Sequence, residues 1–317
     1  MPGRKARVVK IVNNHEITWE EALEDYLILK KAQGRSERTL KDYQYHVKLF
    51  FRRFPDSTFL NPSTLKKNLL RHLTEEIKPA SYNNRLVYLK TFFGWCVDEK
   101  ALPANPLKDI KRRKIDERIV QIEEQKLQEL LASPNQKTFS GLRDYALLLL
   151  QLDTGIRPKE ALSLLISDIN LRSYEIYIRA ENAKTRVART VSISPITARA
   201  IQKLINVRPD NWFMEIPVFC TCDGRKFSGN GWYKRLSAYG KKLGITFYPY
   251  QLRHTFALEF LRNGGNSFAL QKTLGHADLN MTKRYVALSD NDMKEQHLKA
   301  SPVLKLVQES KRVRKLK

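Results

Sequence analysis

Apolar side chains recur at steps of three and four residues through most of the first hundred positions of the chain. This spacing places them on one face of a helix. Four such segments follow one another, with no strand-like alternation between them, at 18–33, 40–54, 61–73 and 81–100. Short helices with one apolar face pack together, so the sequence predicts a small helical domain at this end of the chain.

The pattern becomes mixed from Ile122 onwards. Helical spacing covers 122–133, 142–155 and 157–169, and it resumes from about residue 231. The second of these helices is apolar on nearly every face, which predicts that it is buried. Between these helices, 174–179 and 189–194 alternate apolar and polar residues, which predicts two strands of a hairpin. The expected fold is mainly α with a small antiparallel β-sheet.

These changes of pattern divide the chain into five parts. We expect a basic arm at 1–17, the helical domain at 18–102, a linker at 103–121, a second domain at 122–290 and a tail at 291–317. The linker holds two prolines and the basic run Lys111–Lys114, which fits either a solvated connection or a strap along a polyanion. Apolar tail residues fit either packing within the chain or contact with a neighbouring protomer; they are Leu298, Val303, Leu304, Leu306 and Val307.

Charge narrows the class of partner. The 317 residues include 57 basic and 33 acidic ones, which gives a formal net charge of +24. Basic residues outnumber acidic ones on both sides of residue 115, so two bodies that touch one long polyanion fit better than a neutral enzyme with a basic tail. No segment approaches the roughly 20 apolar residues of a spanning helix, and no signal-peptide pattern opens the chain. We therefore expect a soluble, cytoplasmic, nucleoid-associated protein that binds double-stranded DNA and no membrane.

The cysteines give no sign of a disulfide framework or a metal site. The chain has three, Cys96, Cys220 and Cys222, and an odd count without a regular framework fits a reducing compartment. Cys220 and Cys222 have C-x-C spacing, but no second cysteine pair or histidine pair accompanies them. We expect no metal and no other cofactor.

Two arginines stand where anions are favoured. Arg157 lies between the buried helix and the next one, in the segment "TGIRPKEAL", and an arginine in apolar surroundings needs an anionic partner. Glu160 or Asp153 could supply that partner as a purely structural ion pair. Arg253 stands at the start of a helix in "LRHTF", where a guanidinium and the helix N-terminus both favour phosphate; a capping or surface role fits equally well.

Three further residues indicate a function only when their order along the chain is considered. Lys184 lies in the turn of the expected hairpin, in "AKTRVARTV", and turn lysines are usually solvated. His276 follows Gly275, which is a residue type that ends helices. Tyr285 follows nine residues later, in "LGHADLNMTKRY". Taken singly, each of these residues fits an ordinary packing or surface role.

Taken together, Arg157, Lys184, Arg253, His276 and Tyr285 resemble, in this order, the tyrosine recombinase (phage integrase) family. The similarity covers residues 122–290, and the helical N-terminal half is similar to the family's SAM-like core-binding domain. The resemblance implies a mixed α+β catalytic domain and a C-shaped clamp around DNA. It also implies that two DNA sites are paired by a homotetramer, while a monomer in free solution is left open.

The resemblance assigns a role to each of these residues. Tyr285 would attack a DNA phosphate, which leaves a 3′-phosphotyrosyl bond and a free 5′-hydroxyl. The permanently charged, planar guanidinium groups of Arg157 and Arg253 would hold the non-bridging oxygens, and His276 would add a donor. Lys184 would give a proton to the leaving 5′-oxygen. Because the covalent bond conserves the phosphodiester energy, rejoining needs no ATP.

One position departs from the family pattern. The family usually shows His-x-x-Arg around the second arginine, whereas this chain has "YQLR", with Tyr250 in place of the histidine. A phenol can donate a hydrogen bond to phosphate, but with a pKa near ~10 it is a poor base at neutral pH. His254 lies beside Arg253, and we expect it to have a packing role.

The expected activity is site-specific DNA recombination, most simply the integration or excision of a mobile element. Two alternatives remain open, namely type IB topoisomerase-like relaxation and a non-catalytic DNA-binding accessory protein with the same fold. The target DNA sequence and the separation of integrase from resolvase or dimer-resolution roles do not follow from the sequence. Basic residues expected to contact DNA are Arg35, Arg38, Lys41, Lys48, Lys111, Arg112 and Arg113.

Overall fold

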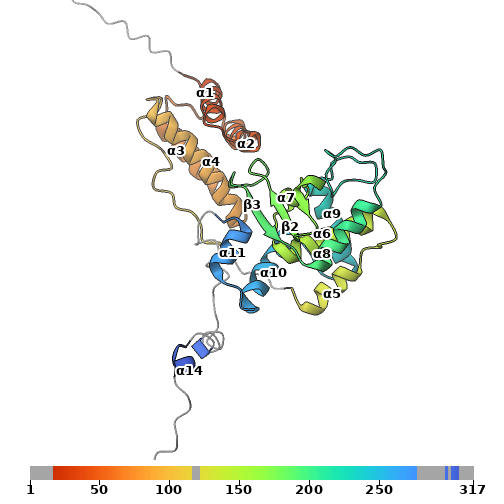
Figure 1. The fold of residues 1–317 in the computed structure, drawn as a ribbon. Helices are drawn as coiled ribbons and strands as arrows, with labels where there is room; N and C mark the ends of the chain where they lie inside the picture. The colour runs from red at the N-terminus through yellow and green to blue at the C-terminus, as the bar shows by residue number, and fades with distance from the viewer. Residues whose placement is uncertain (1–16, 116–121, 277–296, 299–300, 307–317) are drawn as a thin grey trace, which may run out of the picture. The chain divides into compact units, whose positions relative to one another are not determined.

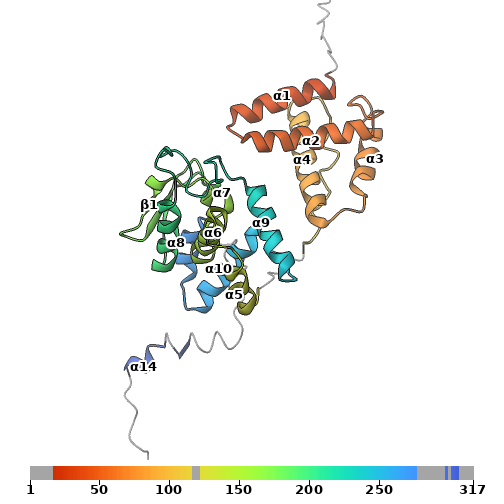
Figure 2. The same ribbon diagram turned by 90° about the vertical axis from the view of Figure 1, so that its right-hand side faces the viewer.

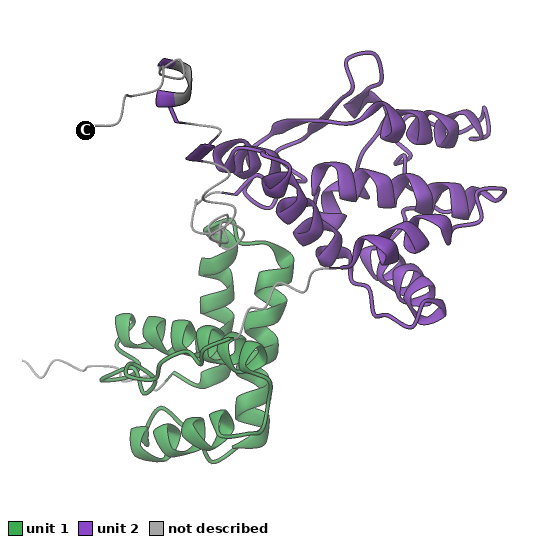
Figure 3. Ribbon diagram, turned by 90° about the horizontal axis from the view of Figure 1, so that it is seen from below, with its two compact units in different colours: residues 1–118 green, residues 119–317 purple. Residues whose placement is uncertain are grey.

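The computed structural model describes residues 17–115, 122–276, 297–298 and 301–306. The chain divides into two units, residues 1–118 and residues 119–317 (Figure 3). We describe each unit by itself. The expected clamp around DNA concerns the placement of one unit relative to the other, and it stays a prediction.

Four helices build the first unit (Figures 1 and 2): α1 (Trp19–Ala32), α2 (Glu37–Arg53), α3 (Pro62–Leu73) and α4 (Pro79–Asp98). Side-chain oxygens of Thr18, Ser36 and Asn61 cap the first three by accepting a backbone N–H of the first turn. Such caps satisfy donors that the helix itself leaves unpaired. The four predicted helices are confirmed, with α2 starting before the expected Leu40.

Aromatic rings fill the core of this unit. Tyr26, Phe50, Phe92 and Phe93 are almost completely buried. Tyr26 meets Phe92 edge to face, with ring centroids 5.5 Å apart and an interplanar angle of 76°, a geometry that favours the ring quadrupoles. His72 is also completely buried and lies against the Phe50 ring, at a centroid distance of 5.6 Å.

The segment after α4 runs back along that helix. Lys90 Nζ donates hydrogen bonds to the carbonyls of Lys108 (2.6 Å) and Ile110 (3.1 Å). Asn83 exchanges hydrogen bonds with the backbone of Arg113, at 2.9 and 2.8 Å. These contacts place the first part of the expected linker against the helical unit.

The second unit contains the buried helix predicted from the sequence. Its elements are α5 (Glu124–Ala132), α6 (Phe139–Thr154), α7 (Pro158–Ala161), the 3-10 turn η1 (Ile166–Asp168), β1 (Ile169–Asn170), β2 (Glu175–Ile178), β3 (Arg189–Ser192), α8 (Pro195–Asn206), α9 (Gly229–Lys242), α10 (Pro249–Arg262) and α11 (Ser267–Leu274). Helix α6 packs against both α8 and α10, which explains its apolar surface on nearly every face.

The three strands form one antiparallel sheet in the order β1–β2–β3. Ile176 of β2 pairs with Val191 of β3, and both side chains are buried. Residues two apart on a strand share a face, so Arg189 lies on the same face of β3 as Val191. The expected small antiparallel sheet is confirmed, and helix α11 packs against β3.

Two parts of the second unit differ from the sequence-based expectation. The helix expected at 157–169 is wrong, because α7 ends at Ala161. Ser163 Oγ donates to the carbonyl of Glu160 (2.9 Å), and the Asp168 carboxylate accepts the Leu165 N–H (2.9 Å); such side-chain bonds compete with helix continuation. Helix α8 was not expected, although Ser194 caps it and Pro195 follows directly.

Within the described ranges, no helix is long and apolar enough to cross a membrane. Of the tail, Leu298 and the short helix α14 (Val303–Leu306) are described, and Leu298, Val303 and Leu306 are exposed. Val307 lies outside the described residues.

Candidate active site

The candidate site begins where α6 ends. Gly155 closes this helix with a φ of 61°, in the left-handed region that favours glycine. A Cβ atom there would come within 2.4 Å of the Phe256 ring and 2.7 Å of the Leu274 side chain. Glycine is therefore required both for the turn and for the close approach of α10 and α11. The turn leads through Ile156 to Arg157, the N-cap residue of α7.

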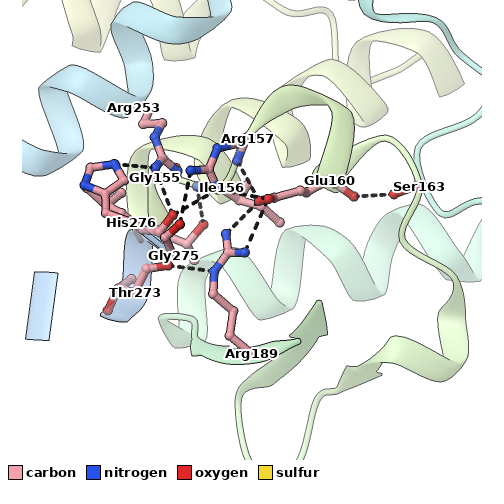
Figure 4. Close-up of polar contacts among 12 residues, drawn as sticks. Gly155, Ile156, Arg157, Glu160, Ser163, Arg189, Arg253, Thr273, Gly275 and His276 are labelled. Atoms are coloured by element: carbon pink, nitrogen blue, oxygen red, sulfur yellow. Dashed lines mark hydrogen bonds and ion pairs between the residues drawn. The ribbon is translucent and has the colours of Figure 1, made fainter. Parts of the chain in front are cut away.

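Arg157 is buried and points toward the C-terminal end of α11 (Figure 4). Its Nη1 donates to Glu160 Oε1 and to the carbonyl of Leu274, both at 3.1 Å, and its Nη2 donates to the carbonyl of Gly275 at 3.2 Å. Of the two partners considered for a structural ion pair, Glu160 is the one observed. Asp153 instead accepts the Ser194 N–H at 2.6 Å.

Arg253 reaches the same place from α10. Its Nη1 donates to the carbonyl of Gly155 at 2.6 Å, and its Nη2 donates to the carbonyl of Leu274 at 2.8 Å. The same Nη2 lies 2.8 Å from His276 Nε2. Both guanidinium groups are anchored by backbone carbonyls at the negative end of a helix, which stabilises cations in a buried position.

His276 is placed by the end of α11. Gly275 has a φ of 61° and ends this helix, as the sequence predicted. The His276 backbone N–H donates to the carbonyl of Gln271 at 3.1 Å, and its side chain is buried next to Arg253 (Figure 4). The ring therefore lies beside the Arg253 guanidinium, which shares the Leu274 carbonyl with Arg157.

Glu160 and Arg189 complete the cluster. Arg189 Nη2 donates to Glu160 Oε2 at 2.6 Å, and its Nε donates to the carbonyl of Thr273 at 3.0 Å. Burial disfavours the ionised Glu160 carboxylate, but its hydrogen bond to Arg189 and the charges of Arg189 and Arg157 outweigh burial and hold its pKa below the ordinary value. One carboxylate thus serves two arginines, while Arg253 is held by carbonyls.

Arg189 was not predicted as a site residue, although the sequence carried a signal for it. In the alternating segment 189–194, Arg189 shares the inward face with Val191 and Ile193. A charge on the buried face of a strand needs a buried counter-charge, and that counter-charge is Glu160. Through this pair, β3 is tied to the segment that carries Arg157.

The other expected site residues lie elsewhere or outside the described residues. Lys184 is exposed in the turn between β2 and β3, and among the described contacts it makes none with the arginines. Tyr250 lies in the first turn of α10 and is 57% exposed. Tyr285 lies outside the described residues, so the structure tests no role for it.

All seven residues expected to contact DNA are exposed, and two of their side chains also make contacts within the protein. Arg38 forms an ion pair with Asp42, at 3.1 Å. The Arg113 guanidinium lies over the Tyr82 ring, 3.9 Å from its centroid, in a cation–π contact.

The described residues contain no cluster of three His, Cys, Asp or Glu side chains arranged to hold a metal ion. Cys220 is buried and Cys222 is exposed.

Comparison with known families identifies the two units. The model of the phage integrase family matches residues 121–292, and the model of the phage integrase N-terminal SAM-like domain matches residues 23–100. The chain belongs to the phage integrase family. The match covers the segment that holds Arg157, Arg253 and His276, so this family member is a tyrosine recombinase, as the resemblance implied.

Curated relatives cover nearly the whole length of this phage integrase family member. It is 26% identical over 301 residues to tyrosine recombinase XerC of Pelotomaculum thermopropionicum, an alignment that covers 88% of this chain and 97% of the relative. It is 27% identical over 293 residues to tyrosine recombinase XerD of Listeria innocua, covering 87% and 96%.

Solved structures share the fold. The integrase of the transposon Tn1549 in complex with a circular intermediate DNA aligns with a TM-score of 0.73 and 17% identity, covering 90% of this chain and 100% of that one. A lambda integrase tetramer bound to a Holliday junction aligns with a TM-score of 0.69 and 16% identity, covering 86% and 78%. These likenesses confirm the mainly helical fold with a small sheet.

Proposed function

We propose that this tyrosine recombinase cuts and rejoins double-stranded DNA at specific sites through a 3′-phosphotyrosyl intermediate. The observation that carries the proposal is the contact of Arg157, Arg253 and His276 around the end of α11. Two buried guanidinium groups and an imidazole, brought together from distant segments, form a concentrated set of cationic and hydrogen-bond donors. Such a set stabilises the charge that develops on a phosphate under nucleophilic attack.

Tyr285 is the proposed nucleophile. Its hydroxyl forms the new bond to phosphorus, and the bond from phosphorus to the 5′-oxygen breaks. Nearby cations favour the phenolate over the phenol, which makes the hydroxyl more reactive. Reversal of the step by a different 5′-hydroxyl rejoins the strand and frees Tyr285.

Lys184 is the proposed donor of the proton that the leaving 5′-oxygen takes up. A lysine ammonium can give up a proton, whereas a guanidinium does so poorly. Lys184 is exposed at the tip of the hairpin, and Arg189 of β3 ties that hairpin to the arginine cluster. The hairpin therefore provides a route by which DNA contact can bring Lys184 to the phosphate.

We propose further that the enzyme pairs two DNA sites as a homotetramer and that the mobile-element role is integration or excision. Support for the first comes from the lambda integrase tetramer bound to a Holliday junction. Support for the mobile-element role comes from the Tn1549 transposon integrase, which shares the fold. The exposed apolar residues Leu298, Val303 and Leu306 offer a surface for contact between protomers. Sequencing the DNA trapped on the enzyme in cells separates an element end from a chromosomal site.

A nicked suicide substrate tests the reaction. The nick lets the 5′-end diffuse away after cleavage, so a covalent protein–DNA adduct that resists SDS accumulates. We expect an adduct with the unaltered protein and none with Tyr285→Phe. Absence of the adduct on a site that the protein binds specifically would favour a non-catalytic accessory role, whereas relaxation of supercoiled DNA without exchange would favour topoisomerase-like activity.

A further inference from the structure

Three tyrosine side chains are exposed near the N-terminal ends of α9 and α10. Tyr233 of α9 is 38% exposed, Tyr248 is 45% exposed, and Tyr250 is 57% exposed. The rings of Tyr233 and Tyr248 are stacked, with centroids 5.8 Å apart and an interplanar angle of 15°. Exposed aromatic residues that gather at one place mark a surface that binds something.

Tyr248 stands at a position where a side chain usually caps the helix by accepting a backbone N–H of its first turn. It is the N-cap residue of α10, and its side chain makes no capping hydrogen bond. Ser228 and Asn266 cap the neighbouring helices α9 and α11 with side-chain oxygens. At α10, the Gln251 side chain instead accepts the Tyr248 N–H at 2.7 Å. Helix α10 therefore lacks a side-chain cap from its N-cap residue, and the Tyr248 ring at this position is exposed to solvent.

The helix beneath this ring pair is held firmly. Asp144 of α6 is completely buried, and its Oδ2 accepts the Tyr239 hydroxyl at 2.7 Å and Arg235 Nε at 2.5 Å. These bonds fix α9 to the central helix of the unit. Because Tyr233 lies on α9 and Tyr248 begins α10, the stacked rings have rigid support on both sides.

The ring pair begins the helix that carries Arg253. Tyr248 is the N-cap residue of α10, and Arg253 lies in the second turn of the same helix. The exposed Lys234 follows Tyr233 directly and adds positive charge beside the rings.

We propose that Tyr233 and Tyr248 form a platform on which an unpaired base of the cut DNA strand stacks. The proposal rests on the proposed cleavage reaction. After cleavage, the strand with the free 5′-hydroxyl must leave its duplex before it joins a new partner, and its bases lose their stacking neighbours. An aromatic face accepts any base without reading its sequence, so the platform would hold the released strand without adding to site specificity.

The test uses the full-length protein and a suicide substrate made from the DNA site recovered with the covalent adduct. After the adduct has formed, an excess of a strand identical to the released one is added, with a 5′-phosphate that prevents rejoining and with the fluorescent base 2-aminopurine at one of its first four nucleotides. Stacking on a tyrosine ring quenches the emission of 2-aminopurine. The same strand with a free 5′-hydroxyl measures rejoining. The variants are Tyr233→Ala and Tyr248→Ser, and the matched controls are Tyr233→Phe and Tyr248→Phe, which keep the ring.

We expect quenching to be strongest at one of these four nucleotides with the unaltered protein and with both Phe variants. Tyr233→Ala and Tyr248→Ser should lose this quenching. They should still form the adduct, and they should rejoin strands roughly tenfold more slowly, in keeping with the loss of one stacking contact. Tyr248→Ser should also raise the Tm, because serine restores a capping hydroxyl.

Three results would overturn the platform. Quenching that persists in Tyr233→Ala and Tyr248→Ser would place the base elsewhere. Phe variants that behave like Tyr233→Ala would assign the effect to the hydroxyl. A lower Tm for Tyr248→Ser together with loss of the adduct would make the ring pair a structural brace between α9 and α10. Failure of the unaltered protein to form any adduct would instead count against the proposed cleavage reaction itself.

Discussion

Arg157 and Arg253 donate hydrogen bonds to one and the same acceptor, the carbonyl oxygen of Leu274, at 3.1 and 2.8 Å. Like charges repel, so two buried guanidinium groups stay together only where an anchor offsets the repulsion. Here the anchors are the last carbonyls of α11 and the carboxylate of Glu160. The position of the arginines therefore depends on where α6 and α11 end.

Gly155→Ala should lower both stability and cleavage. The new Cβ would stand 2.4 Å from Phe256 in a backbone of positive φ, so the Gly155 carbonyl that accepts Arg253 must shift. Strain of this kind costs about 1–3 kcal/mol. Urea denaturation should show this cost as a lower free energy of unfolding. The matched control is Gly244→Ala, where φ is +68° and no heavy atom lies within 4 Å. An equal effect of both substitutions would show that the close packing around Gly155 does not matter.

Glu160→Gln should destabilise the second unit by about 3 kcal/mol, because it leaves two buried arginines without a counter-charge. The pKa of Glu160 lies below its ordinary value when the protein is folded. Its contribution is therefore present above the unfolded pKa of about 4.3 and is lost as the pH falls through the folded pKa. The unfolding midpoint in urea should fall more steeply below about pH 4 in the unaltered protein than in Glu160→Gln. Parallel pH profiles would contradict this.

His72 should make the first unit sensitive to mild acid. Burial, followed by the charge of Arg85, lowers its pKa to about 4, and neither ring nitrogen has a hydrogen-bond partner among the described residues. The unfolded chain takes up the proton near pH 6.5, so stability is full above that pH and is lost as the pH falls toward 4. Between pH 7 and pH 5 the loss should be about 2 kcal/mol.

Urea unfolding of the full chain at the two pH values, followed by the fluorescence of Trp19 and Trp95 in unit 1, measures this effect. His72→Leu keeps an apolar side chain in the pocket and should flatten the pH dependence. The pKa of His46 is also lowered by burial, so His46 adds a pH dependence of the same sign. A residual slope in His72→Leu should disappear in the double variant with His46→Leu. An unchanged slope in that double variant would contradict the assignment.

Neighbouring arginines of the basic run should have different roles. Arg112 and Arg113 are both exposed. Arg112→Ala should weaken DNA binding and reduce the slope of log affinity against log salt by about 1. Arg113 contacts the Tyr82 ring and the carbonyl of Leu73, so Arg113→Ala should chiefly lower the free energy of unfolding, by about 0.5–1 kcal/mol. Salt titrations of DNA affinity and urea unfolding of both variants measure this difference, and a larger salt effect for Arg113→Ala would reverse the assignment.

Helix positions could be predicted from the sequence wherever a local signal exists. Apolar spacing and the caps Thr18, Ser36 and Asn61 define the first unit, and Gly155 and Gly275 end their helices as predicted. The helix expected at 157–169 failed because Ser163 and Asp168 form side-chain bonds that replace helical ones. The spacing of apolar residues alone does not show that such side-chain bonds will replace the helical ones.

The candidate site was predicted in part. Arg157, Arg253 and His276 could be grouped from the ordered motifs. In the structure both arginines bind the Leu274 carbonyl and Arg253 contacts His276; their catalytic roles stay predictions. The anchoring of both arginines by the Leu274 carbonyl could not be predicted. Every residue has a backbone carbonyl, so the residue type does not show which one will accept these bonds. Arg189 could have been found from its inward position on β3, but its partner Glu160 depends on the packing of distant segments.

The side chain at position 250 distinguishes two hypotheses: that the reaction needs a base there, and that a hydrogen-bond donor is enough. Tyr250 lies three residues before Arg253 on α10, one turn away on the same face, where the family resemblance places a histidine. If proton transfer at this position limits the rate, Tyr250→His should raise the rate of adduct formation by 10–100-fold, within the range of general acid–base catalysis. Rates are measured in single turnover on the suicide substrate from pH 5.5 to 9.

The pH profile identifies the source of any gain. An imidazole acting as a base loses its proton near pH 6.5, so the advantage of Tyr250→His should grow as the pH rises through that value and then level off. Tyr250→Phe is the matched control, since it keeps the ring and removes the hydroxyl. A Tyr250→His rate equal to that of the unaltered protein, with Tyr250→Phe slower than both, would mean that a hydrogen bond to phosphate suffices here and that no base is missing.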